Sequence, residues 1–558
     1  MRLVAVVALI TLASASACGT DDPIVGEIAG TVTHYDYTFD LETRRAHSKV
    51  EVAVETEGDC LTLPFRATEL DTASARWNGK PTATVTANDT QIQLCGQGVA
   101  AGKPLIIETD QTVKLATLST SQVGYSVTND SNGNPFSYLV SWVGGCDRFG
   151  PCDSRPDRFA TYTFHVTHKD TLAVSCPGTI TEVSPTETTC DFTHGGGPTY
   201  SGFGFAAYPR AAWVQADKGM WGSVHVYVYD RPTTMITAAV SPTYNDGYVR
   251  WLEQNLGPYP FGSELRIYTA PTYWSGFEHP GNIVLDDGLA RALMPAYVHN
   301  VQHILDHEMA HQWAGDQTTL ADTYDFVWKE SMAEYLAFSY EDLVEPIAAK
   351  GTASYWKRAS AGAKFFPVPG EKPALFDYYG DVYGPGPMIL FRQLAVLTSK
   401  QQVLAAIASV LGREHALSVD EVVAALAEKT GLDLAGYAAA WIHGTGAPEW
   451  PVINTQFTAG AGTSTLHITQ TKGQARRCKF HIALEGAAAG ESQLVEVDTF
   501  RNGIDQTLSV PTPAFSVTKT TLDPNLECLV FAGTLAREVT HPWLTQRGLR
   551  NLASGAHP

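Results

Sequence analysis

The feature that most constrains this chain is a pair of histidines four residues apart, followed at a fixed distance by a glutamate. Residues 307–311 read HEMAH, and Glu330 follows after an eighteen-residue spacer. On a helix, His307 and His311 leave the same face about one turn apart. Two neutral imidazoles at that separation suit zinc, and a carboxylate from a following helix can complete the protein ligands while one position stays open. Glu308 can then reach a water molecule at the metal without being a ligand itself.

HExxH alone is weakly specific, and a surface helix with solvated histidines is the alternative interpretation. The surrounding residues favour a buried helix over residues 300–313, with Gly315 as its natural end. Its apolar component consists of Val301, Ile304, Leu305, Met309 and Ala310. Buried histidines and a buried glutamate need partners, and a metal ion supplies them together. The sequence therefore predicts one Zn²⁺ per chain, held by His307, His311 and Glu330, with Glu308 as the general base.

The wider motif resembles the zinc aminopeptidase family that includes aminopeptidase N and leukotriene hydrolase. Residues 307–337, HEMAHQWAGDQTTLADTYDFVWKESMAEYLA, are similar to the family's HExxH-x-W-x-G, eighteen-residue spacer and N-E-G-F-A-x-Y. Upstream, residues 275–283 (SGFEHPGNI) resemble G-x-M-E-N. Downstream, residues 382–390 (VYGPGPMIL) resemble Y-x-K-G-x-x-x-L. The order of these motifs indicates a member of this family.

The resemblance implies roles for residues outside the zinc motif. Tyr383 stands at the family's catalytic tyrosine, which donates to the developing oxyanion. Glu278 stands at the glutamate that holds the substrate's free amino group, and the neighbouring His279 is a candidate to share that role. Without the resemblance, a buried structural tyrosine and a solvated loop carboxylate would remain the alternatives.

Two further residues are alternative metal ligands by spacing alone. His303 lies one helical turn before His307, and Glu334 lies one turn after Glu330. The family pattern uses Glu330, so we interpret His303 as a residue behind the ligands or at the surface.

The chain departs from the family pattern at several positions around the substrate. The glutamine that helps to hold the substrate amine in the family is missing, because its place falls at Val140, Ser141 or Trp142. The other replacements are Ser275 for glycine, Phe277 for methionine, His279 for asparagine, Lys329 for asparagine, Ser331 for glycine and Pro385 for lysine. None removes a metal ligand or the base, so we expect the departures to affect the substrate pocket.

A chain of 558 residues is too long for one core and predicts a multidomain protein. Short alternating runs such as residues 48–58 and 159–168 predict an N-terminal antiparallel β domain over 25–215, which resembles the family's saddle domain. Residues 216–450 look like a thermolysin-like α/β zinc catalytic domain. Runs at 463–471, 477–486 and 526–533 predict strands of a small C-terminal β-sandwich domain over 451–545. We expect no large C-terminal helical domain of the kind found in bigger family members.

The first seventeen residues predict a signal peptide. Arg2 is their single charge, residues 3–12 form an apolar run, and small residues at 13–17 suit cleavage. Cleavage before Cys18 would resemble bacterial lipoprotein processing, with Cys18 lipidated. We therefore expect an exported protein, either a cell-envelope lipoprotein in the periplasm or outer membrane, or a secreted protein. A lipid at Cys18 would be its membrane contact.

The remaining cysteines predict disulfides. Nine cysteines are present, and setting Cys18 aside leaves an even set, as expected for an exported chain. Proximity favours sequential pairing, although eight cysteines allow about 105 connectivities and buried free thiols are the alternative. The pairs are Cys60 with Cys95, Cys146 with Cys152, Cys176 with Cys190, and Cys478 with Cys528.

Charge and motif together define the function classes that remain. The net charge of −20 argues against nucleic acid as a partner, because there is no basic surplus to neutralise phosphates. The favoured prediction is a zinc aminopeptidase acting on peptides outside the cytoplasm. A thermolysin-like endopeptidase and a non-catalytic peptide-binding lipoprotein are the alternatives.

Overall fold

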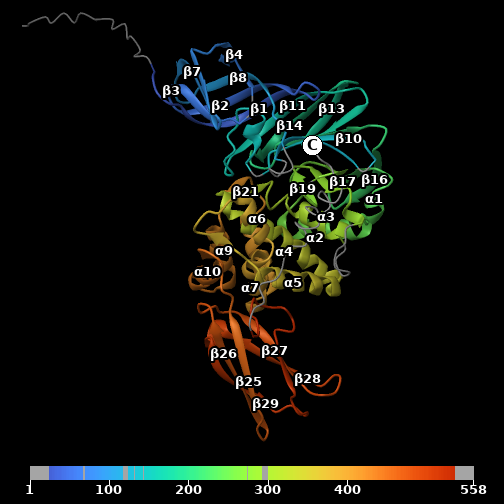
Figure 1. Ribbon diagram of the computed structural model, residues 1–558, viewed down its shortest axis with the longest axis vertical. Helices are drawn as coiled ribbons and strands as arrows, with labels where there is room; N and C mark the ends of the chain where they lie inside the picture. Colours follow the sequence, from blue (N-terminus) through green and yellow to red (C-terminus); the bar gives the residue numbers. More distant parts are fainter. Residues whose placement is uncertain are drawn as a thin grey trace, which may run out of the picture.

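The computed structural model describes residues 24–66, 69–116, 123–130, 132–142, 144–272, 274–291 and 300–533. Three bodies follow one another along the longest axis: a β-rich N-terminal body, a largely helical middle and a small C-terminal β body (Figure 1). This confirms the prediction of a multidomain protein with a β-rich N-terminal domain. The candidate signal peptide, Cys18 and residues 534–545 lie outside the described residues.

The N-terminal body is built from three sheets. The eight-stranded sheet has the spatial order β13 Thr179–Ser184, β14 Glu187–Pro198, β11 Phe159–Thr167, β1 Ala29–Asp40, β2 Arg45–Thr56, β8 Pro104–Thr112, β4 Glu69–Trp77 and β5 Lys80–Pro81. The four-stranded sheet has the order β12 Leu172–Ser175, β15 Gly204–Pro209, β10 Pro135–Val140 and β9 Gly124–Asn129. The three-stranded sheet has the order β3 Gly58–Pro64, β7 Gln91–Val99 and β6 Thr84–Ala87.

Alternation along the strands decides which face each sheet buries. In β1, Tyr35, Tyr37 and Phe39 are fully buried, while the residues between them are partly or fully exposed. The prediction of a wholly antiparallel domain is wrong at one pair, because β1 and β11 run parallel. Between β1 and β11 the chain passes through β2 to β10. It then returns along the side of β1 that does not pair with β2, and such a crossover permits a parallel pair.

The middle body begins with a mixed five-stranded sheet and continues as helices (Figure 1). The sheet order is β16 Val214–Trp221, β17 Val224–Asp230, β18 Glu264–Ala270, β20 Asn282–Asp286 and β19 Gly276–His279. The helices are α1 Ile236–Ala239, α2 Pro242–Leu256, α3 Asn300–Ala310, α4 Phe326–Val344, α5 Pro346–Ala361, α6 Leu375–Val382, the π-helix Pro387–Arg392, α7 Gln393–Leu397, α8 Lys400–Val410, α9 Val419–Thr430 and α10 Ala435–Trp441. Two short parallel pairs join β21 Thr318–Leu320 to β23 His415–Leu417 and β22 Val368–Pro369 to β24 His443–Gly444.

Local signals in the sequence set the helix ends. Ser418 caps α9 together with Glu421 in a capping box, and Gly431 closes that helix in the left-handed conformation. Ser241 caps α2, which has proline in its first turn. Helix α4 differs because every residue from 326 to 341 is buried. A helix buried on all sides can hold polar groups away from water, and α4 supplies much of the candidate site.

The C-terminal body consists of two three-stranded sheets. Their orders are β25 Val452–Thr458, β26 Thr463–Lys472 and β29 Asp505–Pro511, and β28 Ser492–Asp498, β27 Lys479–Glu485 and β30 Lys519–Leu522. In the described residues of this body, α11 Thr499–Asn502 is the one α-helix.

The prediction of a regular strand at residues 526–533 is wrong. Asp523 and Leu526 have positive φ values, and the backbone amides of Glu527 and Cys528 donate to the Asp523 carboxylate. A turn stabilised by hydrogen bonds to Asp523 therefore replaces the predicted strand at these residues.

All four predicted disulfides are present. They join Cys60 to Cys95 across β3 and β7, Cys146 to Cys152, Cys176 to Cys190, and Cys478 to Cys528. Three lie in the N-terminal body and one in the C-terminal body. Each closes a short stretch of chain within one body, as sequential pairing predicts.

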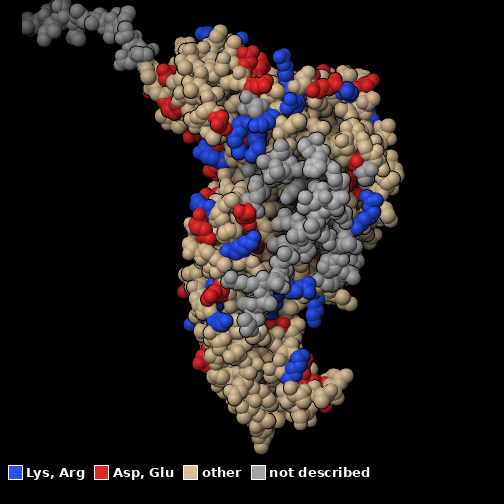
Figure 2. All heavy atoms as spheres, in the orientation of Figure 1, with Lys and Arg blue, Asp and Glu red and all other residues tan. Residues whose placement is uncertain are grey.

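The visible surface mixes acidic and basic residues over the two larger bodies, whereas the tip of the C-terminal body is mostly uncharged (Figure 2). The sequence explains the tip, because residues 451–471 contain no Asp, Glu, Lys or Arg. Among the helices of the described residues, none combines the length and the hydrophobicity needed to cross a membrane.

A buried arginine joins the N-terminal and middle bodies. Arg231, which follows β17, lies 2.5 Å from Asp130 at the end of β9 and 2.5 Å from Asp287 after β20. Its guanidinium also lies 5.0 Å from the Trp213 ring centroid. Both Arg231 and Asp130 are buried, so removing either one would leave the other as an unpaired charge in the protein interior.

Arg231→Met should lower the free energy of unfolding by about 3–5 kcal/mol, because it leaves buried carboxylates without their cation. Arg250→Met is the matched control, since Arg250 pairs with Asp246 at an exposed helix surface and its loss should cost about 0–1 kcal/mol. Thermal unfolding of both variants measures the difference. Equal shifts in Tm would contradict a structural role for the buried ion pair.

Candidate metal centre

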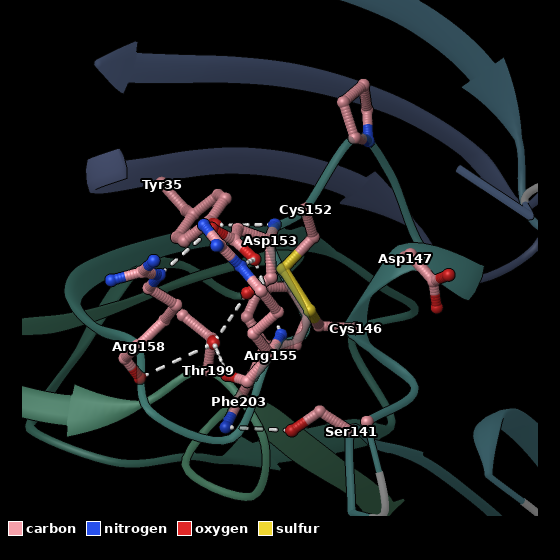
Figure 3. Close-up of a disulfide and its surroundings, with 12 residues drawn as sticks. Tyr35, Ser141, Cys146, Asp147, Cys152, Asp153, Arg155, Arg158, Thr199 and Phe203 are labelled. Carbon is pink, nitrogen blue, oxygen red and sulfur yellow. Dashed lines mark hydrogen bonds and ion pairs between the residues drawn. A yellow bond between two sulfur atoms is a disulfide. The ribbon is translucent and has the colours of Figure 1, made fainter. Parts of the chain in front are cut away.

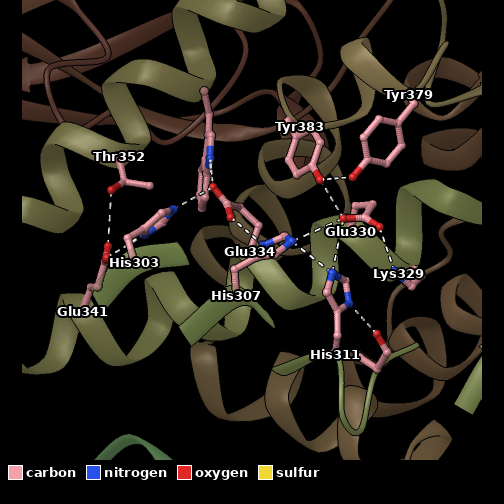
Figure 4. Close-up of polar contacts among 12 residues, drawn as sticks. His303, His307, His311, Lys329, Glu330, Glu334, Glu341, Thr352, Tyr379 and Tyr383 are labelled. Carbon is pink, nitrogen blue, oxygen red and sulfur yellow. Dashed lines mark hydrogen bonds and ion pairs between the residues drawn. The ribbon is translucent and has the colours of Figure 1, made fainter. Parts of the chain in front are cut away.

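The three predicted ligands converge between α3 and the start of α4. His307 lies on α3, His311 follows its last turn, and Glu330 lies on the buried α4. Glu330 Oε2 is 3.3 Å from the Nε2 atoms of both histidines, which are 3.0 Å from each other (Figure 4). All three side chains are buried, with exposures of 4%, 1% and 1%. The structure therefore brings together the ligand set that the sequence predicts.

These separations fit a tetrahedral ion. Ligand atoms about 2.0–2.2 Å from zinc stand about 3.3–3.6 Å apart at the corners of a tetrahedron, which the two 3.3 Å separations match and the 3.0 Å separation of the two histidine nitrogens approaches. His311 Nδ1 lies 2.9 Å from the Ala314 carbonyl oxygen, which only accepts, so its proton is on Nδ1 and the Nε2 lone pair faces inward. His307 Nδ1 is likewise 2.9 Å from a Glu334 oxygen. Two lone pairs and a carboxylate oxygen converge, and a cation between them satisfies all three.

The electrostatics of the site also favour a cation. Burial lowers the pKa of His307, but Glu330 and Glu334 outweigh burial and raise it to about 10. Burial alone would raise the pKa of Glu330, but Lys329 and the two histidines hold it well below its usual range. The carboxylate is thus an anion ready to bind a metal ion.

A chain of buried polar side chains continues behind His307 (Figure 4). Glu334 Oε1 lies 3.1 Å from His303 Nε2 and accepts from Trp356 Nε1 at 3.0 Å. His303 Nδ1 lies 2.7 Å from Glu341. His303 and Glu334 are thus placed behind the ligands, where a carboxylate orients a ligating histidine and raises its basicity.

Glu308 reaches the same site, where one of its oxygens lies within 4.8 Å of donor atoms of His311 and Glu278. It is 6% exposed, and burial, together with the nearby Glu278 and Glu330 carboxylates, raises its pKa to about 8. Gly276 on β19 passes so close that a Cβ there would lie 2.6 Å from Glu308 Oε1. Glycine at this position therefore makes room for the base, a role that the sequence suggested only through the motif around it.

Tyr383, which caps the end of α6, points toward Glu330. Its hydroxyl donates to Glu330 Oε2 at 2.9 Å and is hydrogen bonded to the Tyr379 hydroxyl. Burial raises the pKa of Tyr383 well above its usual range, so the group keeps its proton. Tyr383 is therefore a neutral donor beside the ligand set, and Tyr379, which sequence reasoning missed, fixes its orientation.

Glu278 also reaches the site, from the edge strand β19. A Glu278 oxygen, a Glu308 oxygen and a His311 nitrogen all lie within 4.8 Å of one another. Glu278 is 3% exposed, and its Oε1 lies 2.7 Å from Lys329 Nζ. Burial lowers the pKa of Lys329, but Glu278 and Glu330 outweigh burial and raise it.

The His279 ring makes a different contact from the predicted one with the substrate amine. Its ring nitrogen Nδ1 lies 3.0 Å from the carbonyl oxygen of Ser201 in the N-terminal body. Gln312, directly after the HEMAH motif, donates to the His279 carbonyl oxygen and accepts from the Gly281 amide. The ring thus anchors the strand that carries Glu278, and the geometry gives no support for contact of His279 with the substrate amine.

Comparison with known proteins agrees with this geometry. Residues 252–364 match the Peptidase family M1 domain. The matched segment contains the HEMAH motif and Glu330. This confirms the resemblance found in the sequence, and with it the prediction of a zinc metallopeptidase. No protein of curated function is similar enough in sequence to match.

Solved structures of M1 enzymes share the fold. Aminopeptidase A of Legionella pneumophila, in complex with aspartic acid, has 14% identity and a TM-score of 0.71, covering 92% of this chain and 60% of its own. An M1 zinc metallopeptidase mutant of Deinococcus radiodurans, bound to the substrate Tyr-Ser-Ala, has 21% identity and a TM-score of 0.60, covering 75% and 95%. A two-domain M1 zinc metallopeptidase bound to L-tryptophan has 20% identity and a TM-score of 0.61, covering 75% and 96%. This chain thus spans about three fifths of the Legionella enzyme.

The structure places Trp142, one of the three residues near the missing glutamine, beside Tyr379. Their ring centroids are 4.7 Å apart, and Trp142 also contacts Trp274 and Phe326. The preceding Ser141 is buried and accepts from a backbone amide. These rings form an aromatic wall that carries no charge.

A disulfide closes a loop that follows Trp142 in the sequence (Figure 3). The Cys146–Cys152 bond closes the turn that follows Trp142, and the next residue, Asp153, donates its amide to the Tyr35 hydroxyl at 3.0 Å. Thr199 donates to the Asp153 carbonyl oxygen at 2.6 Å. The loop is therefore tied to the N-terminal core at its far end.

The buried chain behind His307 predicts graded effects on zinc binding. Glu334→Ala should lower zinc affinity by about 10–100-fold, because His307 loses the carboxylate that orients it. Glu341→Gln, one contact further away, should have a smaller effect. Competition with a chelator measures both affinities. A larger loss for Glu341→Gln than for Glu334→Ala would contradict this order.

Proposed function

We propose that the protein is a zinc aminopeptidase that removes amino-terminal residues from peptides outside the cytoplasm. The observation that carries this is the buried Glu278 carboxylate, which lies within 4.8 Å of donor atoms of Glu308 and His311. An ammonium held by Glu278 lies beside the metal ligands. Because the first carbonyl carbon is two bonds from the amino nitrogen, this presents the first peptide bond of a substrate for cleavage.

The residues divide the reaction between them. His307, His311 and Glu330 would hold zinc, which supplies polarisation of the carbonyl and a water molecule that is easily deprotonated. Glu308 takes the proton of the attacking water and passes it to the nitrogen of the leaving amine. Tyr383, whose hydroxyl contacts Glu330 in the substrate-free protein, would donate instead to the carbonyl oxygen that becomes negative. Glu278 holds the ammonium while the bond breaks.

A second candidate function is an endopeptidase on the same fold. Two observations favour it: Glu278 is already paired with Lys329, and the place of the family's second amine-binding residue falls at Val140, Ser141 or Trp142, none of which is a glutamine. The third alternative, a non-catalytic peptide-binding lipoprotein, is disfavoured because the ligands, base and tyrosine all converge.

Export is part of the proposal. Four disulfides support it, because such bonds persist in oxidising compartments. We propose a bacterial cell-envelope lipoprotein anchored through Cys18, or a secreted protein. Fractionation of cells that express the wild-type chain and a Cys18→Ala variant separates the two.

A digest of matched peptides with free and acetylated amino termini tests the proposal. An aminopeptidase cleaves the free peptides one residue at a time and leaves the acetylated ones intact. Internal cleavage of both sets would establish the endopeptidase instead. No cleavage of either by zinc-loaded protein would favour the binding protein.

Glu308→Gln should retain zinc and lose hydrolysis by at least about 10²–10⁴-fold, since the base is removed while the ligands remain. Metal analysis and turnover on the same sample measure both properties. Turnover near the wild-type rate would remove Glu308 from the mechanism.

Tyr383→Phe should lower kcat by about 10²–10³-fold with little change in KM, because the hydroxyl is needed mainly in the transition state. Tyr379→Phe is the companion variant and should have a smaller effect, since it removes only the contact that orients Tyr383. If KM alone rose in Tyr383→Phe, the tyrosine would bind substrate instead.

A further inference from the structure

Lys329 is an unexpected cation inside the candidate site. Its side chain is 1% exposed, and Nζ lies 2.7 Å from Glu278 Oε1 and 2.9 Å from Glu330 Oε1. The same ammonium therefore contacts the proposed substrate-binding carboxylate and a proposed zinc ligand. A buried lysine requires such partners, and here both come from the site.

The surrounding chain is shaped to hold this lysine. Gly315, after the HEMAH helix, has a φ of +146°, and a Cβ there would lie 2.7 Å from Lys329 Cε. The lysine stem thus passes through space that only glycine leaves open at that position. The turn after α3, which carries His311 and Gly315, thus leaves room for the Lys329 side chain that pairs with Glu278.

The ammonium occupies the position that a substrate amine needs. In the substrate-free protein, one oxygen of Glu278 already has a cation 2.7 Å away. A second ammonium on the same carboxylate would stand about 4–5 Å from Lys329 in a site withdrawn from water. Like charges at that distance repel by an amount worth at least tenfold in affinity at the effective dielectric of a protein site.

We propose that Lys329 is a specificity-determining residue that stands in for the substrate ammonium at Glu278 and so reduces the preference for free amino termini. This rests on the proposed function and refines it: free amino termini remain the preferred substrates, but the preference over blocked termini is smaller than Glu278 alone would give. The lysine acts through Glu278 and also holds Glu330 Oε1, which leaves Oε2 directed at the two histidines.

The test compares kcat/KM for a free peptide and its acetylated counterpart in wild type, Lys329→Met and Lys329→Asn. Methionine keeps an unbranched stem without charge, and asparagine is the residue of the family pattern. Both variants should raise the ratio of free to acetylated kcat/KM by about ten- to a hundredfold, mainly through a lower KM for the free peptide. Because each ratio is measured on one sample, loss of folded or zinc-loaded protein cancels.

Two controls isolate the charge at Glu278. Lys357→Met removes another largely buried lysine, paired with Asp523 away from the site, and should leave the ratio unchanged. In the Glu278→Ala background, Lys329→Met should change the ratio less than it does in the wild-type background, since no carboxylate remains there to hold a substrate ammonium. Calorimetric binding of free and acetylated dipeptide amides to zinc-loaded Glu308→Gln protein, with and without Lys329→Met, should show the same shift without turnover.

The outcomes are separable. An unchanged or lower ratio in both Lys329 variants overturns the proposal while wild-type aminopeptidase activity stands. A lower ratio would show that Lys329 positions Glu278 for the amine. If wild-type protein cleaves free and acetylated peptides equally and Glu278→Ala leaves that equality intact, the proposed function itself is wrong.

Discussion

The structure depends on one buried helix that carries ionisable residues inside the protein core. Helix α4 has no exposed face from residue 326 to 341, yet it contains Lys329, Glu330 and Glu334. Isolated charges would be too costly there, so each is matched by a partner from another element. The matching charges come from α3 and β19, and this requirement fixes how these elements pack. Most of these paired buried charges lie at the candidate metal centre, where a dication would balance the remaining negative charge.

The sequence predicted the parts of this arrangement that depend on local spacing. Four residues between His307 and His311 define one face of a helix whatever surrounds it. Alternation along the strands and capping residues such as Ser418 are equally local signals. Cysteines that are close in sequence form the disulfides, as in Cys146–Cys152. Glu330, Tyr383 and Glu278 were placed by the family motif, whose order along the chain reflects a shared fold.

The parts that the sequence did not reveal depend on contacts between distant segments. Spacing left His303 and Glu334 as alternative ligands, and only the approach of α3 to α4 shows that they form a chain behind His307. Nothing local indicated that Lys329 turns toward Glu278. The parallel pairing of β1 with β11 likewise follows from the path of the chain through other sheets. An apolar run at residues 526–533 looked like a strand because hydrophobic pattern does not report the turn that Asp523 imposes.

The position of Glu278 links substrate recognition to the docking of two domains. Its strand is held from one side by Gln312 after α3 and from the other by His279, whose ring reaches Ser201 in the N-terminal body. Trp142 enters the same site from the N-terminal body. The predicted metal ligands and base lie in the middle body, as does the strand that carries Glu278. A small shift between the bodies would therefore move the aromatic wall directly and Glu278 only through the contact of His279 with Ser201, while leaving the predicted ligands together. Under the proposed function, selectivity for the amino terminus would therefore be the property most sensitive to changes at the domain interface, which the buried Arg231 ion pair between the same bodies stabilises.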